Sequence, residues 1–412
     1  MVDRLPLRAR VATAMGEAAG RLSRVAGRGD GSVIGGKIGL WLEPGLLSML
    51  AADRQVTLVT GTNGKTTTTR LIAAGLSVLG VGVASNSFGA NMEEGLTAAL
   101  GQARDAPYAV LEVDEKYLPR VIEATAPRAV VLLNLSRDQM DRAAEIWLVA
   151  RRWRDALASV PATCVVANVD DPLIAWAASS ATGVTRVSAG QRWREDSWCC
   201  PQCGSHLRRD GDDWRCCECG CARPKVSWAL DGGKVVDSAR RTHDLDLTLP
   251  GRANRANAVM ALAAVEVFGV HVARALPAMR RVTSVAGRYT QVERKGRTVR
   301  LLLAKNPAGW LEAFDVLDPP PTPVVLSVNA QEPDGKDTSW LWDVDYRVLR
   351  GRPVFVAGER RLDLAVRLEA DEVPFDLVQG IDEAVDRVHG KLDVLANYTA
   401  FQQIRAALGR VS

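Results

Sequence analysis

The sequence predicts an α/β fold with two domains, the first of which carries a phosphate-binding loop and an inserted cysteine-rich segment. Short apolar segments alternate with helical patterns, which is typical of a parallel sheet covered by helices. A glycine-rich turn ending in Lys-Thr connects one of these strands to the next helix. Two Cys-x-x-Cys pairs interrupt the alternation and indicate an insertion.

Composition excludes several classes of function. The 412 residues carry a net charge of +4, which is small for this length and gives no reason to expect a nucleic-acid partner. There is no run of eighteen apolar residues, so no transmembrane helix is expected, and the N-terminus lacks the apolar core of a secretory signal. Cysteines cluster between Cys199 and Cys221, which favours a metal site over disulfides.

The elements of the first domain follow from periodicity. Residues 1–50 are expected to form a helical segment, with a helix over 7–26 and a glycine-rich stretch over 27–36. The central domain is expected over residues 51–288. Its alternating strands and helices are predicted at residues 55–60, 65–79, 108–113, 116–126, 129–134, 141–159 and 163–168.

The second domain is expected over residues 289–412 and to be Rossmann-like. Its strands are predicted at residues 299–304, 323–329, 353–357 and 392–397. Before it, residues 226–249 have a polar, strand-like pattern and residues 254–268 a helical one.

Residues 61–67 read GTNGKTT and lie between a predicted strand and a predicted helix. Backbone N–H groups of such a turn, together with the helix N-terminus, bind phosphate oxygens. Lys65 is expected to reach the terminal phosphates and Thr66 to ligate Mg²⁺. Val59 replaces the first glycine of the general pattern, which favours a narrower family of ATP-binding proteins. The residues predicted to bind ATP in this loop are Thr62, Asn63, Gly64, Lys65, Thr66 and Thr67.

Acidic and polar residues follow the next predicted strands. Glu112 ends the strand over residues 108–113, at the edge of a parallel sheet where ligands bind. It is the candidate Mg²⁺ residue, which would bind the ion either directly or through one of its ligands, although the acids of this segment could also be a solvated strand end. Residues 134–142 (NLSRDQMDR) place polar groups at the same edge, where Asp141 could equally cap a helix.

The cysteine pairs have the spacing of a zinc ribbon. Twelve residues separate the two Cys-x-x-Cys pairs, and a glycine follows the second cysteine of each pair. Four thiolates complete a tetrahedral site, so the metal is expected to be structural. The expected zinc ligands are Cys200, Cys203, Cys216 and Cys219. Cys199, Cys217 and Cys221 leave the choice of ligands partly open.

These segments resemble the Mur ligase family, whose ATP loop also lacks the first glycine and whose Mg²⁺-binding glutamate matches Glu112. Residues 138–141 (DQMD) are similar to the family's Asp-His-Leu-Asp, with Gln139 in the histidine position. Residues 168–172 (NVDDP) and 251–257 (GRANRAN) also resemble family segments. The resemblance implies that Asn257 and Arg288 meet the nucleotide. Lys305 stands where the family often has histidine.

Within that family, the resemblance is to the MurT branch and covers residues 35–407 approximately. It is carried by the cysteine pairs, the short N-terminal part, residues 305–309 (KNPAG) and residues 334–343 (DGKDTSWLWD). These are ligase subunits of lipid II isoglutaminyl synthase, and their partner is the glutaminase GatD. The resemblance implies ATP-dependent amidation of the D-glutamate α-carboxylate of lipid II to D-isoglutamine, through an acyl phosphate, in the cytoplasm at the inner face of the membrane.

The same resemblance implies that an acid of the second domain serves the partner's active site. Asp337 and Asp343 are the candidates, with Asp334 a weaker third. Lys305 is expected either to steady the acceptor carboxylate or acyl phosphate, or to be a surface lysine. Outside the cluster, Cys164 lies in an apolar strand and does not suit glutamine hydrolysis, so the ammonia would come from solution or from another chain.

Two other functions fit part of the pattern. An amino-acid-adding Mur ligase or a folylpolyglutamate-type ligase would need an amino acid, rather than ammonia, for release of ADP. A nucleotide-binding regulator with a zinc ribbon would bind a polyanion tightly and show no carboxylate-dependent ATP turnover. The small net charge argues against the regulator.

Overall fold

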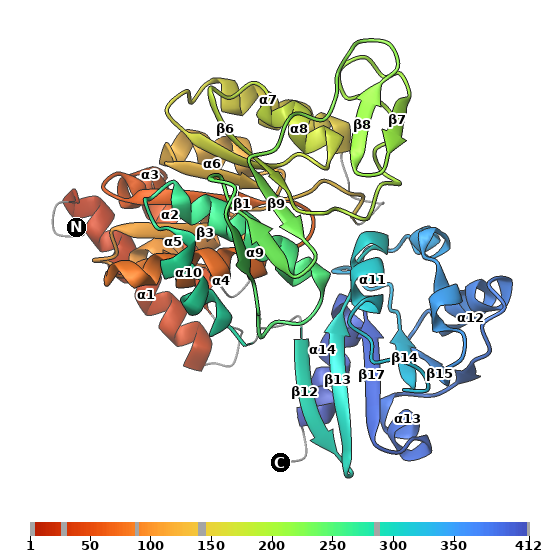
Figure 1. Ribbon diagram of the computed structural model, residues 1–412. Coiled ribbons are helices and arrows are strands. Elements are labelled where there is room, and N and C mark those ends of the chain that lie inside the picture. Colours follow the sequence, from red (N-terminus) through yellow and green to blue (C-terminus); the bar gives the residue numbers. More distant parts are fainter. Residues whose placement is uncertain (1–4, 26–30, 87–89, 139–145, 284–288, 410–412) are drawn as a thin grey trace. The chain divides into compact units, whose positions relative to one another are not determined.

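The computed structural model describes residues 5–25, 31–86, 90–138, 146–283 and 289–409. The chain forms two compact units, each built around its own sheet (Figure 1). The first unit contains most of the chain up to residue 283. The second contains residues 284–412 with two short segments, 136–144 and 250–252. Among the described residues, no helix combines the length and the apolar character that crossing a membrane requires.

The first unit holds a nine-stranded sheet in the order β11-β10-β9-β6-β5-β4-β1-β3-β2. In this order, the strands from β9 to β2 are all parallel, and β10 and β11 extend the sheet in antiparallel pairing. The strands are β1 (Gln55–Thr60), β2 (Val83–Ser85), β3 (Tyr108–Glu112), β4 (Ala129–Leu132), β5 (Cys164–Asn168), β6 (Gly183–Ser188), β9 (Trp228–Asp231), β10 (Lys234–Val236) and β11 (Thr242–Asp244). The central strands are buried because helices cover both faces.

The helices of this unit connect and cover the parallel strands. They are α1 (Leu7–Val25), α2 (Ser32–Leu42), α3 (Leu46–Ala51), α4 (Lys65–Leu76), η2 (Ser77–Leu79), α5 (Glu93–Gln102), α6 (Leu118–Thr125), α7 (Ile146–Ala158), α8 (Pro172–Ala178), α9 (Arg252–Glu266) and α10 (Val272–Arg280). Helix α4, which follows the phosphate loop, packs closely at Gly75, where a Cβ would lie 2.8 Å from Met279 and 3.0 Å from Val265. This packing fixes the helix whose first turn carries Lys65 and Thr66.

Helix α2 begins inside the stretch that the sequence marks only as glycine-rich. Its glycines allow it to pack backbone against backbone on α1. A Cβ on Gly16 would lie 2.6 Å from the carbonyl oxygen of Gly35, and a Cβ on Gly35 equally close to that of Gly16. Helix α2 also packs on α5, where a Cβ on Gly36 would lie 1.7 Å from the carbonyl oxygen of Glu94. Because glycine is a poor helix former in isolation, these tertiary contacts account for a helix here.

The predicted strands of the central sheet agree with β1, β3, β4 and β5 to within two residues at each end. The strand-like stretch over residues 226–249 forms β9 to β11, and the helix expected over 254–268 is α9. Strand β2 has no counterpart among the predicted elements, because a three-residue strand is too short to show periodicity. Helices α5 and α8 and strand β6 also have no predicted counterpart.

The second unit holds a six-stranded sheet in the order β12-β13-β17-β14-β15-β16, parallel except for the β12–β13 pair. Its strands are β12 (Tyr289–Arg294), β13 (Arg297–Leu303), β14 (Val324–Ser327), β15 (Val354–Ala357), β16 (Asp376–Leu377) and β17 (Lys391–Ala396). Its helices are α11 (Pro307–Phe314), η3 (Ser339–Asp343), η4 (Tyr346–Leu349), α12 (Arg361–Ala370), α13 (Ile381–Arg387) and α14 (Tyr398–Gly409). Two apolar clusters form the core of this unit.

Candidate active site and metal centre

The phosphate loop leaves β1 and enters α4 through two glycines with positive φ. Gly61 has φ 136° and Gly64 has φ 88°. Both positions also lack space for a side chain: a Cβ on Gly61 would lie 2.9 Å from backbone atoms of Asn134, and one on Gly64 would lie 2.4 Å from Oδ1 of Asn257. Glycine is therefore required at both ends of the loop for its conformation and for its close neighbours.

Asn134, two residues beyond β4, holds the loop in place. Its carbonyl accepts a hydrogen bond from the N–H of Thr62 (2.9 Å). Its side chain accepts from the N–H of Asn63 (2.9 Å) and donates to the carbonyl of the same residue (3.0 Å). The sequence pattern places Asn134 at the edge of the sheet but gives no sign of this role, because the contact depends on the pairing of β1 with β4.

Lys65 is the first residue of α4 and is almost fully buried. Its Nζ donates to the carbonyl of Gly61 (2.7 Å) and, at 3.3 Å, to that of Thr62. It also forms an ion pair of 2.7 Å with Oε1 of Glu115, just beyond β3. Burial raises the pKa of the adjacent Asp114, and the Glu115 carboxylate adds to that effect. The loop lysine is thus folded back over its own loop and neutralised by a carboxylate.

Glu112, the last residue of β3, is buried and rigidly placed. It pairs in register with Val59 of β1, and its backbone exchanges two hydrogen bonds of 2.8 Å with the side chain of Asn86. Its Oε2 is buried and has no hydrogen-bond partner among the described residues. A buried carboxylate oxygen without a donor is costly unless it binds a cation, so this atom fits a metal ligand.

Some of the other residues of the predicted sites lie at the loop, and some lie outside the described residues. Asn257, in the second turn of α9, abuts Gly64 and therefore lies against the loop. Thr62, Thr66 and Thr67 are buried at the loop and the start of α4. Gln139, Asp141 and Arg288 lie outside the described residues.

The structure gathers the four cysteines that the spacing selects. The Sγ atoms of Cys200, Cys203, Cys216 and Cys219 all lie within 4.8 Å of one another. The Cys200–Cys219 and Cys203–Cys216 sulfur distances are 3.6 and 3.5 Å. Zn–S bonds of about 2.3 Å in a tetrahedron give S···S distances near 3.8 Å, so the cluster has the size that zinc requires.

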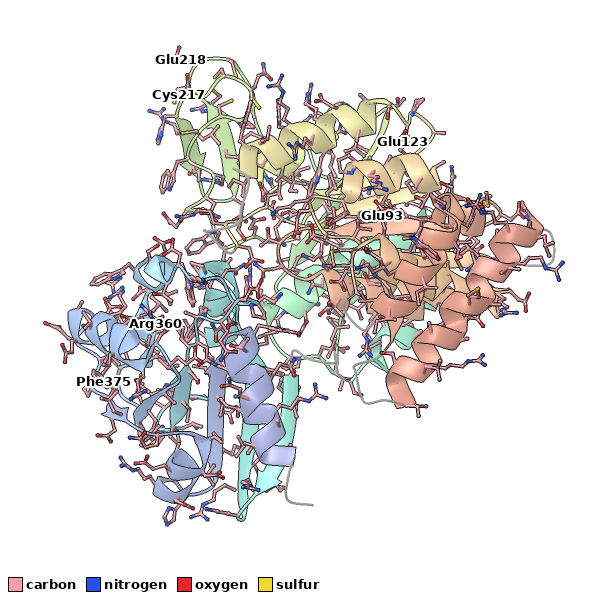
Figure 2. The ribbon with its side chains drawn as sticks, turned by 180° about the vertical axis from the view of Figure 1, so that it is seen from behind. Glu93, Glu123, Cys217, Glu218, Arg360 and Phe375 are labelled. Atoms are coloured by element: carbon pink, nitrogen blue, oxygen red, sulfur yellow. The ribbon has the colours of Figure 1, made fainter. Side chains whose placement is uncertain are left out.

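The surroundings of the cluster also match a pair of zinc knuckles. Gly204 and Gly220 have φ of 79° and 74°, which lets the chain turn sharply after each pair. The N–H groups of Glu218 and Cys219 point at Sγ of Cys216, at 3.3 and 3.4 Å. Hydrogen bonding by Ser205 lowers the pKa of Cys203 to about 6, whereas burial raises that of Cys200 to about 11. Cys217 and Glu218 lie at the tip of this ribbon (Figure 2).

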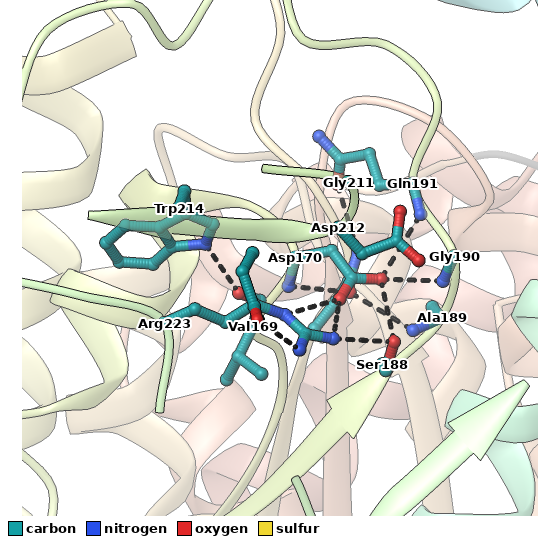
Figure 3. Close-up of polar contacts among 12 residues, drawn as sticks. Val169, Asp170, Ser188, Ala189, Gly190, Gln191, Gly211, Asp212, Trp214 and Arg223 are labelled. Atoms are coloured by element: carbon teal, nitrogen blue, oxygen red, sulfur yellow. Dashed lines mark hydrogen bonds and ion pairs between the residues drawn. The ribbon is translucent and has the colours of Figure 1, made fainter. Parts of the chain in front are cut away.

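The ribbon hairpin of β7 (Leu207–Asp210) and β8 (Asp213–Cys216) is attached to the central sheet by polar contacts (Figure 3). Arg223 donates to Oδ1 of Asp170 at 2.7 and 3.1 Å, and Trp214 Nε1 donates to the carbonyl of Val169 at 3.0 Å. The other oxygen of Asp170 accepts from the N–H of Gly190 (2.6 Å). Asp170 is almost fully buried, so the ribbon is fixed to the loop after β5.

In the second unit, Lys305 follows β13 at the edge where parallel strands end. Its ammonium lies 5.6 Å from the centre of the Tyr398 ring. The next residue, Asn306, is buried and caps α11 by accepting from the N–H of Gly309 (2.8 Å). The cap fixes the backbone beside Lys305, which itself is partly exposed.

The three candidate acids of the second unit have different surroundings. Asp334 accepts hydrogen bonds from the N–H and the hydroxyl of Thr399, so it is engaged within the fold. Asp337 accepts from the N–H of Ser339 (2.8 Å), at the start of η3. Asp343 is exposed at the end of η3 and pairs with Arg137 (3.1 Å), whose segment belongs to this unit.

The Mur ligase middle domain profile matches residues 59–265, half of the chain, and includes the phosphate loop, Glu112 and the ribbon. The chain belongs to the Mur ligase family. A second profile, the MurT ligase C-terminal domain, matches residues 303–401. The segments with Lys305, Asp337 and Asp343 lie within this match. This chain thus matches a Mur ligase middle domain, which contains the phosphate loop, and a MurT-type C-terminal domain.

Curated relatives agree with both profiles. A Streptococcus pneumoniae protein named lipid II isoglutaminyl synthase (glutamine-hydrolyzing) subunit MurT is 28% identical, over 96% of this chain and 97% of that protein. Its Staphylococcus aureus namesake is 27% identical over 95% of each chain. By contrast, a UDP-N-acetylmuramate–L-alanine ligase of Paenarthrobacter aurescens is 29% identical but covers 62% of this chain and 50% of that protein.

Solved structures agree with the fold of a Mur ligase. A pseudomurein peptide ligase type C from Methanothermus fervidus has a TM-score of 0.64 at 18% identity, covering 86% of this chain and 79% of that one. MurF ligase from Thermotoga maritima, solved in complex with ADP, has a TM-score of 0.59 at 16% identity, covering 88% and 82%. At these identities the likeness concerns the fold alone.

Asn134→Ala is expected to weaken ATP binding by up to about thirtyfold, because it removes two hydrogen bonds worth about 1 kcal/mol each from the loop of this Mur ligase. The dissociation constant is to be measured by calorimetry, with thermal unfolding as the control for the fold. Because the backbone bond from Thr62 remains, the protein should stay folded. Unchanged ATP affinity in a folded variant would show that Asn134 does not position the loop.

Proposed function

We propose that this chain is the ligase subunit that amidates the α-carboxylate of D-glutamate in the stem peptide of lipid II, giving D-isoglutamine for peptidoglycan biosynthesis. The observation that carries the proposal is similarity to two MurT subunits of lipid II isoglutaminyl synthase over at least 95% of both chains. The amino-acid-adding relative matches a smaller share of each chain. Because the proposed substrate is a lipid-linked precursor, the chain would act at the inner face of the cytoplasmic membrane.

The reaction consists of two transfers. The carboxylate oxygen attacks the γ-phosphorus of ATP, the bond to the bridging oxygen breaks, and ADP leaves, which produces an acyl phosphate. Ammonia then attacks the acyl carbon, phosphate leaves with the electrons of the C–O bond, and the nitrogen loses a proton. Activation is needed because a carboxylate is a poor electrophile and phosphate is a good leaving group.

Residues of the first unit would bind and orient ATP. Lys65 would contact the terminal phosphates, and the loop N–H groups and the N-terminus of α4 would bind their oxygens. Thr66 and Glu112 would hold Mg²⁺, which supplies charge neutralisation for phosphoryl transfer. The buried Oε2 of Glu112, which has no hydrogen-bond partner in the described part of the chain, supports this assignment. Asn257 and Arg288 would meet the rest of the nucleotide.

Lys305 would act on the acceptor side of the reaction. A cation there would lower the repulsion between the substrate carboxylate and the phosphates of ATP, and would then stabilise the acyl phosphate. Its place after β13 and the capped backbone beside it support this role. Gln139, where the family has histidine, is a further candidate for the acceptor site.

Ammonia would come from a GatD-like glutaminase that forms a heterodimer with this chain. The proposed contact includes Asp337 and Asp343, one of which would complete the partner's active site. Trp342, beside Asp343 in η3, is 58% exposed, and tryptophan is enriched at protein interfaces, which is consistent with this contact.

Lys65→Ala is expected to abolish amidation. Lipid II, ATP and either glutamine or ammonium would be supplied to the chain co-purified with its glutaminase, and D-isoglutamine measured by mass spectrometry. The loss should occur with both nitrogen sources, because the phosphoryl transfer precedes both. An ADP release that requires an added amino acid instead of ammonia would favour the amino-acid-adding ligase, and full activity of the variant would refute the loop assignment.

Cys216→Ser is expected to lose zinc and to lower the melting temperature, because structural zinc binding is coupled to folding. The matched control is Cys217→Ser, an exposed neighbour outside the four-sulfur cluster, which should keep both. Zinc per chain is to be measured by elemental analysis of the purified protein. Absence of zinc from the wild-type protein, or equal loss in the two variants, would contradict the assignment.

Asp337→Asn or Asp343→Asn is expected to lower glutamine-driven amidation at least tenfold while ammonium-driven amidation persists. Only the glutaminase step would need the carboxylate, so the two nitrogen sources separate partner activation from ligation. Asp334→Asn is the comparison, since its contacts with Thr399 predict a loss of stability instead. If neither of the first two substitutions distinguishes glutamine from ammonium, the role in the partner's site is wrong.

A further inference from the structure

Helix α1 has an unusual distribution of side chains. Its large apolar residues face solvent, and its small residues face the protein. The exposed fractions are 75% for Leu7, 46% for Val11, 50% for Met15, 70% for Leu22 and 88% for Val25; these five residues are the α1 stripe. The buried residues of the helix are Ala9, Ala12, Thr13, Gly16, Gly20 and Ser23. An ordinary surface helix has the opposite arrangement.

The α1 stripe lies on one side of the helix. Its members are separated by four, four, seven and three residues, which returns each to the same face at 3.6 residues per turn. Helix α1 runs along the edge of its unit (Figure 1). Gly16 and Gly20 on the opposite side of the helix contact Gly35 and Gly31, so the stripe faces away from α2. The stripe therefore runs along the whole helix, whose nineteen residues span about 28 Å, with a gap of about two turns between Met15 and Leu22.

Rotation of the helix could not bury the stripe. The approach of α1 to α2 depends on Gly16 against Gly35 and on Gly20 against Gly31, where added Cβ atoms would lie 2.1 to 2.9 Å from backbone oxygens. Leucine or methionine could not occupy these positions. The small residues thus hold the helix in the one orientation that presents the stripe to the outside.

The charges of α1 flank the stripe and are mostly positive. The helix carries four arginines and one glutamate. The glutamate, Glu17, is neutralised by two hydrogen bonds of 2.7 and 2.8 Å from Arg104. The arginines are Arg8, Arg10, Arg21 and Arg24, all exposed. An apolar face with basic flanks complements an anionic lipid surface, where apolar groups enter the acyl boundary and arginines meet phosphates.

We propose that the α1 stripe docks this protein on an anionic bilayer by lying in the plane of the interface. The five charged residues in nineteen exclude insertion across the bilayer, in agreement with the absence of a spanning helix from the described residues. The inference rests on the proposed function only to explain why membrane binding would be useful: an enzyme held at the bilayer reaches a lipid-linked substrate most readily. The attraction itself follows from α1 alone.

The test is co-sedimentation of the full-length chain, with its co-purified glutaminase, on vesicles of phosphatidylglycerol and phosphatidylcholine. Binding is expected to mixed vesicles, to weaken in high salt, and to be much weaker on pure phosphatidylcholine. Leu22→Glu and the milder Val11→Ser should each reduce the partition coefficient, at least tenfold for Leu22→Glu. Leu362→Glu, which alters a 62% exposed leucine of α12, is the matched control and should bind as the wild type.

Two results would overturn the proposal. One is equal vesicle binding by the wild type, Leu22→Glu and Leu362→Glu, or no binding by any. The other is loss of the partner or of self-association in Leu22→Glu without a change in vesicle binding, which would assign the stripe to a protein. ATP affinity is measured in parallel. Vesicle binding without ATP binding would refute the proposed function but support the membrane contact. ATP binding without vesicle binding would refute the membrane contact but leave the proposed function intact.

Discussion

The pairing of β1 with its neighbours β3 and β4 is the constraint on which the nucleotide site depends. It brings the ends of three strands together, so that the loop after β1 meets Asn134 after β4, and Glu115 lies beyond β3. Each of these residues is far from the loop in sequence. The loop has the right glycines for its conformation, but its position is set by these neighbouring strands.

The ribbon is fixed to the same sheet by a buried charge. Asp170 is 6% exposed, and its two oxygens accept from Arg223 and from backbone N–H groups, so the carboxylate is compensated on both sides. A buried ion pair of this kind contributes little to the stability of the fold, because desolvation offsets much of the attraction between its charges. Its main effect is to orient the hairpin on the sheet. Four thiolates can then hold a metal that organises the hairpin, while Asp170 determines where the hairpin lies.

The sequence predicted what depends on local patterns. The strands β1, β3, β4 and β5 and the cysteine spacing follow from periodicity and from motifs, and the family resemblance is confirmed by the profiles. What it missed depends on tertiary contact. Helix α2 needs the Gly16–Gly35 approach, and the role of Asn134 needs the β1–β4 register. The roles of Lys305, Asp337 and Asp343 stay predictions, because they concern molecules that bind to the chain.

The ion pair of Lys65 with Glu115 bears on how the loop works. The lysine is 7% exposed and has two carbonyls and one carboxylate as acceptors, so in its proposed role it would bind phosphates in competition with these groups, Glu115 among them. Several phosphate charges exceed the single charge of a carboxylate, and backbone N–H groups assist them but not Glu115. In the proposed role of Lys65, the pair would keep a buried ammonium compensated and would still let the nucleotide displace Glu115. A neutral partner at position 115 would leave that charge less compensated in the folded chain, at a cost in stability.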